Sequence, residues 1–251
     1  MDHHVKQTPV QGVTGLWGGT QGSLTTASPA LVGEDYSVDF DGNDFLSVAA
    51  SSAFHIGTSD YTVELWMYKD SNGELISAFE KNSPYKGWLL GLNYTANSKI
   101  NWFMLGADGN SATLYSTANV ASGQWQHVAV TRSGDTWRIF LDGTLDSTHT
   151  SDVDPGDSGE NIMIGADKNY PPTAYRYFNG KISNLRIVKG QCLYTSSFTP
   201  ATSPLGNTTQ GASPSNVKLL CCNQSTVTGS VVTPSTITVG LGDPSSADGP
   251  F

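Results

Sequence analysis

The stretch that decides the fold is GQWQHVAVTRSGDTWRIFLDG, residues 123–143. Apolar and polar side chains alternate in both halves, so that Trp137, Ile139 and Leu141 share one face of the second half. A period of two is typical of a β-strand with one buried face. Ser-Gly-Asp at 133–135 separates the halves, and an Asp-Gly pair ends the segment. The stretch predicts two antiparallel strands joined by a tight turn and followed by another.

The same pattern continues on both sides of this hairpin. In residues 36–48, YSVDF and DFLSV flank DGND, another hairpin signal, and residues 61–68, YTVELWMY, alternate in the same way. ELISAFE (74–80), GWLLGLNY (87–94) and KINWFML (99–105) are each long enough for one strand. No long segment has the 3.6-residue period of an amphipathic helix. The sequence therefore predicts an all-β fold.

The composition disfavours two classes of partner. The chain of 251 residues has a formal net charge of −9 and only 13 lysines and arginines, with no basic cluster to neutralise phosphates. Nucleic acid and anionic membrane surfaces are therefore not expected as partners. No apolar run approaches the roughly 20 residues of a membrane-spanning helix. The first residues, MDHHVKQTPVQG, lack the apolar segment of a secretion signal. We expect a product made in the cytoplasm and not inserted into a membrane.

Four segments resemble motifs of laminin-G-like domains, which have the concanavalin-A-like jelly-roll fold. They are YSVDFDGNDFLSV, SDYTVELWMY, the hairpin quoted first and FNGKISNLRIVKG, and they span residues 36–190 in the family's order. The resemblance implies a two-sheet antiparallel jelly-roll sandwich. We expect the sandwich to occupy residues 35–205, between an N-terminal arm at 1–34 and a C-terminal β-prone extension at 206–251.

The end of the chain resembles a narrower group. NLRIVKGQCLYTSSFTPATSPL, followed by NVKLLCCNQSTVTGSVVTPSTITVGLGDP, is similar to the tails of such domains in structural proteins of aquatic bacteriophages. This implies a non-catalytic virion protein, a capsid decoration protein or a tail or fibre module, that displays a lectin-like sandwich for glycan or host-surface adhesion. Its expected partners are other virion proteins, copies of itself and surface glycans. A free-standing carbohydrate-binding module or lectin is the alternative, and a glycoside hydrolase is favoured least.

The sequence lacks the acid pair of a glycoside hydrolase. Retaining glycosidases use two carboxyl groups about 5–5.5 Å apart. Hydrolase relatives of this architecture carry E-x-D-x-E on one strand, and this chain has no such triplet. The nearest pairs, Asp39 with Asp41 and Asp60 with Glu64, have neither the right spacing nor the right surroundings. We expect no enzymatic activity.

Glu64 allows two interpretations. It shares a strand face with Trp66, so it could line a sugar-binding concavity. The favoured interpretation is a buried carboxylate satisfied by His127 or Arg186, because buried charges need partners. His127 and its strand neighbour Trp125 are expected in the core.

Aromatic side chains in loops are the candidates for a ligand site, because exposed rings suit stacking on pyranose rings. The loop at 168–178 carries Tyr170, Tyr175 and Tyr177, and Trp88 and Trp102 are further candidates. The sequence predicts a glycan site at this tyrosine-rich loop.

The laminin-G-like resemblance also implies a structural calcium ion between the first hairpin and the closing strand. The candidate ligands here are the carboxylates of Asp39 and Asp41 and the amide carbonyl of Asn184, all hard oxygens that suit calcium. Ser183 and Asn184 stand where the family commonly has two aspartates, so weakened binding is expected. No other cofactor is expected.

The two arms have few charges and several prolines, and they lack a core of their own. Such segments cannot bury enough apolar area to offset the entropy of ordering. We expect residues 1–34 and 206–251 to become ordered against neighbouring subunits. The sandwich itself is expected to fold without residues 223–251.

Overall fold

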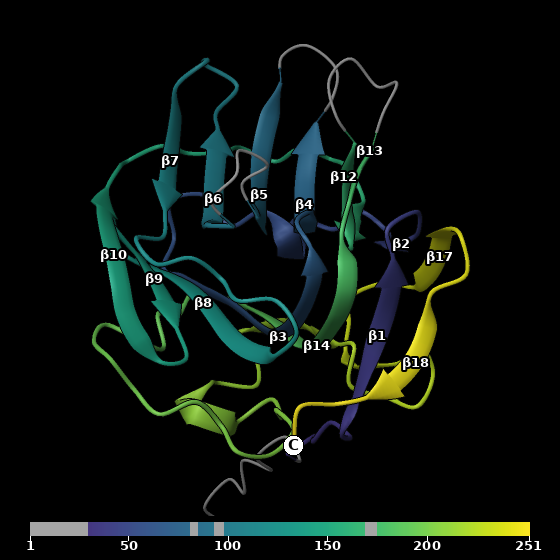
Figure 1. Ribbon diagram of the computed structural model, residues 1–251. Helices are drawn as coiled ribbons and strands as arrows, with labels where there is room; N and C mark the ends of the chain where they lie inside the picture. Colours follow the sequence, from purple (N-terminus) through teal and green to yellow (C-terminus); the bar gives the residue numbers. More distant parts are fainter. Residues whose placement is uncertain (1–29, 81–84, 93–97, 169–174) are drawn as a thin grey trace, which may run out of the picture.

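Two antiparallel β-sheets packed face to face form the molecule (Figure 1). The structure is a computed structural model, and it describes residues 30–80, 85–92, 98–168 and 175–251. Short strands joined by tight turns dominate these residues, and two single-turn 3₁₀ helices, η1 (Ser52–Phe54) and η2 (Thr209–Gly211), interrupt them. The predicted all-β, two-sheet jelly-roll sandwich is confirmed.

The larger sheet contains the hairpin that the sequence predicted. Its strands are β1 (Tyr36–Asp41), β3 (Tyr61–Ser71), β8 (Trp125–Ser133), β9 (Thr136–Leu141), β10 (Thr144–Thr150), β14 (Asn179–Lys189), β15 (Val217–Cys221), β16 (Ser230–Val232) and β18 (Ser245–Asp248). Seven of them run in the order β10-β9-β8-β3-β14-β1-β18, while β15 pairs with β14 and β16 pairs with β15. β8 and β9 form the hairpin, and β10 follows the Asp-Gly turn.

The second sheet carries the face on which the candidate functional site lies. Its strands are β2 (Phe45–Val48), β4 (Glu74–Glu80), β5 (Lys86–Leu92), β6 (Ile100–Leu105), β7 (Ser111–Tyr115), β11 (Ile162–Ile164) and β17 (Ile237–Leu241). They run in the order β17-β2-β11-β4-β5-β6-β7. β12 (Ala166–Lys168) and β13 (Tyr175–Tyr177) form a separate two-stranded ribbon, which lies beside β4 in Figure 1.

The core lies between the sheets and is built from the alternating residues. Trp88, Trp102 and Trp137 are all at most 1% exposed. The indole of Trp102 donates a hydrogen bond to the Tyr61 hydroxyl, and the indole of Trp88 donates one to the Phe54 carbonyl. The prediction of Trp88 and Trp102 as ligand residues is therefore wrong, because their strand positions point inward. Trp125 is only half-buried, so its predicted core position is wrong as well.

One glycine of the closing motif is required by close backbone packing. Gly180 has a φ of 139°, which is favourable only without a side chain. A Cβ atom at this position would overlap the carbonyl oxygen of Tyr68 on β3. Gly180 thus lets β14 pack tightly between β1 and β3 and pair with both strands in the larger sheet.

The C-terminal extension differs from the expectation. β15 pairs with β14, β17 with β2 and β18 with β1, so residues 217–248 supply strands to both sheets of their own sandwich. In Figure 1, β17 and β18 lie at the same side of the molecule, beside β2 and β1. The expectation that this extension needs neighbouring subunits to become ordered is therefore corrected.

The N-terminal arm is described only at its end. Val32 forms an isolated bridge with Gly206, and the Gly33 amide donates to the Leu205 carbonyl. Residues 1–29 lie outside the described part of the chain, so the prediction for them stays untested. In the described residues, no helix has the length and hydropathy needed to cross a membrane.

Candidate functional site

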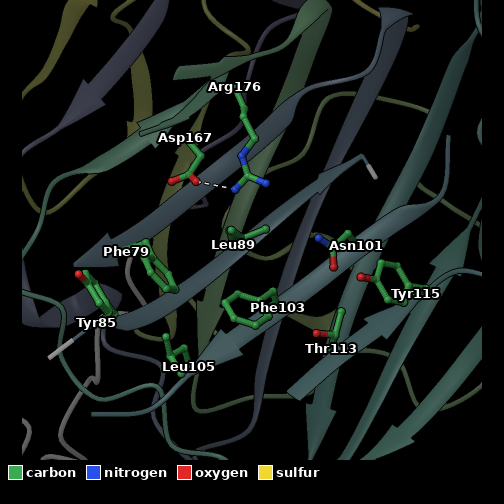
Figure 2. Close-up of a pocket in the computed structure, with 10 residues that line it drawn as sticks. All are labelled: Phe79, Tyr85, Leu89, Asn101, Phe103, Leu105, Thr113, Tyr115, Asp167 and Arg176. Atoms are coloured by element: carbon green, nitrogen blue, oxygen red, sulfur yellow. Dashed lines mark hydrogen bonds and ion pairs between the residues drawn. The ribbon is translucent and has the colours of Figure 1, made fainter. Parts of the chain in front are cut away.

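A groove of about 420 Å³ lies on the outer face of the seven-stranded sheet (Figure 2). β4, β5, β6 and β7 form its floor, and Arg176 and Asp167 of the β12–β13 ribbon stand at one end. The other lining residues are Phe79, Tyr85, Leu89, Asn101, Phe103, Leu105, Thr113 and Tyr115. The groove therefore combines an apolar floor with polar groups at its rim.

The strand register explains why these side chains meet. Leu89, Phe103 and Thr113 stand directly opposite one another on β5, β6 and β7. Asn101 and Tyr115 form the next row, on the same face because the side-chain period of a strand is two. The residues between them, such as Trp102, point into the core. The same strands thus pack the core with one face and line the groove with the other.

The aromatic rings of the groove are placed for contact with a ligand. Phe79 and Phe103 have ring centroids 5.9 Å apart at an interplanar angle of 32°. Both rings are partly exposed, and Tyr115 is 46% exposed at the edge strand β7. Folded proteins bury most of their large apolar rings, so a group of rings exposed on one sheet face is typical of a binding surface.

A charged cluster closes one end of the groove. Arg176 donates to Glu74 Oε1 at 2.9 Å and to Asp167 Oδ2 at 2.7 Å. Both carboxylate side chains are 1% exposed, whereas the Arg176 side chain is 28% exposed. Gly91, opposite Glu74, makes room for this arrangement, because a Cβ atom there would overlap the Glu74 carboxylate. The cluster presents polar groups next to the aromatic floor.

The predicted tyrosine site is only partly described. Tyr175 and Tyr177 lie on β13, on either side of Arg176. Tyr170 and the side chain of Tyr175 lie outside what the structure describes. The ribbon that carries two of the predicted tyrosines therefore contributes to the groove through Arg176, which sequence reasoning missed.

The sequence prediction also missed Phe79, Phe103 and Tyr115. The signal was present in the segment KINWFML, where Trp102 and Phe103 are neighbours and must point to opposite faces of one strand. One of the two rings therefore had to lie outside the core unless both sheet faces were covered.

Glu64 is confirmed as a satisfied buried carboxylate. Its side chain is 1% exposed, and Arg186 donates to Oε1 from Nε at 2.7 Å. His127 Nε2 lies 3.2 Å from Oε2, and the Tyr194 hydroxyl donates to the same oxygen at 2.9 Å. Burial alone would raise the pKa of Glu64. The contacts with Arg186 and His127 outweigh that effect and lower the pKa to about 2. Glu64 therefore does not line a sugar-binding concavity.

The predicted calcium ligands do not form a common site. The Asn184 amide oxygen accepts from the Leu205 amide at 2.7 Å and from Asn223 at 3.1 Å. Asp39 pairs with Lys181, and Asp41 accepts from Asn43. Asp41 stands opposite Asn179, five positions along β14 from Asn184, a separation of roughly 16 Å at the rise of a β-strand.

The first hairpin holds one further acid. Asp44 is fully buried, and its Oδ1 accepts from the Asp41 amide at 3.2 Å. Burial and the neighbouring Asp41 raise the pKa of Asp44 to about 6. In the described residues no cluster of three histidine, cysteine or acidic side chains has the geometry of a metal site. Calcium binding stays a prediction, which melting with and without a chelator tests.

The family is identified by its sequence pattern. Residues 40–193, more than half of the chain, match the concanavalin A-like lectin/glucanases superfamily. The chain belongs to this superfamily. The matched region covers the strands from β2 to β14, including every strand that forms the floor of the groove. No curated protein sequence matches the chain.

Solved structures of the same fold are distant from this chain in sequence. A carbohydrate-binding candidate from Bacteroides ovatus has a TM-score of 0.59 at 16% identity, over 88% of this chain and 61% of its own. The SAP-like pentraxin of Limulus polyphemus has a TM-score of 0.53 at 14% identity, over 86% and 96%. The CBM40 of the Ruminococcus gnavus IT-sialidase, bound to α2,3-sialyllactose, has a TM-score of 0.53 at 16% identity. The match covers 63% of this chain and 91% of the CBM40 chain. At such identities these comparisons show a shared lectin-like fold.

Proposed function

We propose that the chain binds glycans, without cleaving them, in the groove on the outer face of the seven-stranded sheet. The observation that carries the proposal is the exposed aromatic floor beside polar groups. Phe79, Phe103 and Tyr115 offer ring faces for the apolar sides of sugar rings. Asn101 and Arg176 offer hydrogen-bonding groups for sugar hydroxyls. An apolar cleft with a few convergent polar groups is the usual form of a small-molecule site.

The family comparison supports the same proposal. The superfamily is named for lectins and glucanases, and one solved structure of this fold holds sialyllactose. The fold alone does not assign a ligand, because one architecture serves many functions. The groove residues of this chain are what connect the fold to glycan binding.

The acids at the end of the groove support binding over hydrolysis. A glycosidase needs one carboxylic acid that reaches the glycosidic oxygen and donates a proton. Glu74 and Asp167 both have an oxygen committed to Arg176, and both side chains are 1% exposed. Their role in this proposal is to hold the guanidinium at the groove.

A glycan array followed by calorimetry tests the proposal. We expect at least one glycan to bind, and Phe103→Ala to weaken that binding by about tenfold or more, since ring stacking contributes roughly 0.5–1.5 kcal/mol beyond buried area. Phe251→Ala is the matched control, because Phe251 is 38% exposed and does not line the groove. Equal losses in both variants, or no binding to any glycan, would contradict the proposal.

Hydrolysis is measured with the same glycans. We expect no release of reducing sugar from any glycan that binds. Release that Asp167→Asn abolishes, in a variant that still melts at the wild-type temperature, would show that the chain is an enzyme.

We further propose that the sandwich is displayed on a bacteriophage particle, as a capsid decoration protein or as a tail or fibre module. The resemblance of residues 184–244 to phage structural proteins supports this, as does the edge strand β17. Val239 and Leu241 on β17 are 44% and 49% exposed. An open strand edge with exposed apolar side chains suits the addition of a strand from a neighbouring subunit.

The location of the chain on purified particles tests the display proposal. We expect mass spectrometry to find the chain in particles at a fixed copy number. Val239→Lys with Leu241→Lys should lower that number, whereas Phe103→Ala should leave it unchanged. If the chain is absent from particles and binds glycans in solution, it is a free-standing lectin.

A further inference from the structure

A second pocket, of about 410 Å³, opens on the surface away from the groove. The segment around η1 and the ends of β14 and β15 form its wall, which consists of Ser51, Ser52, Ala53, Ser59, Lys189, Gly190 and Lys218. It shares no lining residue with the groove. Hydroxyl and ammonium groups supply nearly all of its side-chain chemistry.

The two lysines are held at this pocket by backbone carbonyls. Lys189 Nζ donates to the Ser52 carbonyl at 3.0 Å, and Lys218 Nζ donates to the Ser215 carbonyl. An ammonium group has three donors, so each keeps two for a ligand. In the part of the chain that the structure describes, neither ammonium is ion-paired, and no acid lines the pocket.

One serine adds a further donor. Ser51 Oγ accepts a hydrogen bond from the Ala53 amide at 3.2 Å, which leaves its hydroxyl hydrogen for another acceptor. Ser59 differs, because its hydroxyl donates to the Ile56 carbonyl. The pocket therefore presents donors from two lysines and from Ser51, together with positive charge.

The charge of the pocket contrasts with that of the chain. The formal net charge of the protein is −9, so a pocket lined by two lysines and by no carboxylate is a local reversal of sign. Two positive charges that line one pocket repel each other, and a bound anion offsets that repulsion. Charge-assisted hydrogen bonds to an oxyanion are also stronger than those between neutral groups.

We propose that this pocket binds a tetrahedral oxyanion, a sulfate or phosphate group, either as the free ion or as an ester. Lys189 and Lys218 supply the charge and four of the donors, and Ser51 supplies another. Affinity falls as ionic strength rises, because the lysines are partly exposed to solvent. The site acts independently of the glycan groove.

Calorimetry or NMR titration tests this with three probes: inorganic sulfate, inorganic phosphate and galactose 6-sulfate, each at constant ionic strength. We expect saturable binding of at least one probe. Lys189→Met with Lys218→Met should weaken it by about tenfold or more, because two charge-assisted contacts are lost. The matched control is Lys99→Met with Lys181→Met, which changes the net charge equally outside the pocket and should retain the affinity.

The three probes also distinguish the sources of the anion. Tighter binding of galactose 6-sulfate than of inorganic sulfate assigns the site to a sulfate ester, and the reverse order assigns it to the free ion. Failure of all three probes to saturate overturns the proposal, and so does an equal loss in the two double variants. Phe103→Ala should bind the oxyanion normally, so failure at the groove and failure at this pocket are distinguishable.

Discussion

At the scale of single residues, Glu64 shows how the fold tolerates charge in its interior. Arg186, His127 and Tyr194 surround a carboxylate that has almost no contact with water. Removing charges from water costs several kcal/mol per ion, so such a cluster adds little net stability while it is intact. Removal of one side chain of the cluster leaves the other charged groups buried without a partner. The free energy of unfolding then falls by several kcal/mol.

Glu64→Gln should therefore lower the free energy of unfolding at pH 7 by about 3–5 kcal/mol. The folded-state pKa of Glu64 lies below its ordinary value of 4.5, so its ionised form stabilises the fold above pH 4.5. That contribution is lost as the pH falls through about 2. The difference between wild type and variant, measured by urea denaturation, should shrink between pH 4.5 and 2.

The control for this prediction is an exposed ion pair. Asp39→Asn removes the partner of Lys181, and both side chains are partly exposed, so the change should stay below about 1 kcal/mol. A Glu64→Gln variant as stable as Asp39→Asn at pH 7 would contradict the buried-cluster account.

Two tryptophans of the β8–β9 hairpin differ in burial, and this difference predicts how much each contributes to stability. Trp137 is 0% exposed, and Trp137→Ala should cost about 3–5 kcal/mol by leaving a large cavity. Trp125 is half-buried and contacts Tyr68 edge-on at 5.9 Å, so Trp125→Ala should cost clearly less. Thermal melting of the two variants checks the order, and a larger loss for Trp125→Ala would contradict the face assignment.

At the scale of strands, the last residues of the chain protect two sheet edges. β17 covers β2, and β18 covers β1. Without them both edges would expose unpaired amides and carbonyls, the usual template for aggregation. The sequence suggested an extension ordered only by neighbouring subunits, because residues 206–251 have few charges, several prolines and no core of their own.

Deletion of residues 236–251 should therefore destabilise the sandwich and not leave it intact. We expect a lower melting temperature, measured by circular dichroism, together with earlier aggregation in light scattering. Deletion of residues 249–251 alone is the control, because it leaves β17 and β18 complete and should have a much smaller effect. An unchanged melting temperature of the longer deletion would show that the sandwich does not depend on these strands.

The strands themselves were predictable because their signals are local. Alternation and turn residues predicted the β8–β9 hairpin and the following turn at Asp142–Gly143, although Ser133, expected in the first turn, belongs to β8 and pairs with Thr136. The pairing of β17 and β18 was not predictable in this way, since β18 pairs with a strand near the start of the described chain. No short-range pattern encodes which edge a distant segment will cover.

At the scale of the whole molecule, local sequence patterns also do not show which sheet face the rest of the chain leaves open, and for this reason the groove was missed. β5 and β6 are apolar on both faces, as in GWLLGL, so the pattern did not distinguish a covered face from an open one. Which face stays open depends on the path of the other strands. Trp88 was therefore assigned to a ligand, although Phe103 on the opposite face lines the groove.

The long reach of the C-terminal strands has a consequence for how the protein is made. The hydrogen bond from the Ser37 hydroxyl to the Asp248 carbonyl spans 211 positions of the chain. During synthesis β1 and β2 leave the ribosome long before β17 and β18 exist, and domains rich in such distant pairings fold slowly. The nascent chain must keep two strand edges uncovered until residues 237–248 have been made. Until then those edges are exposed to aggregation, which chaperones that bind exposed strands would limit.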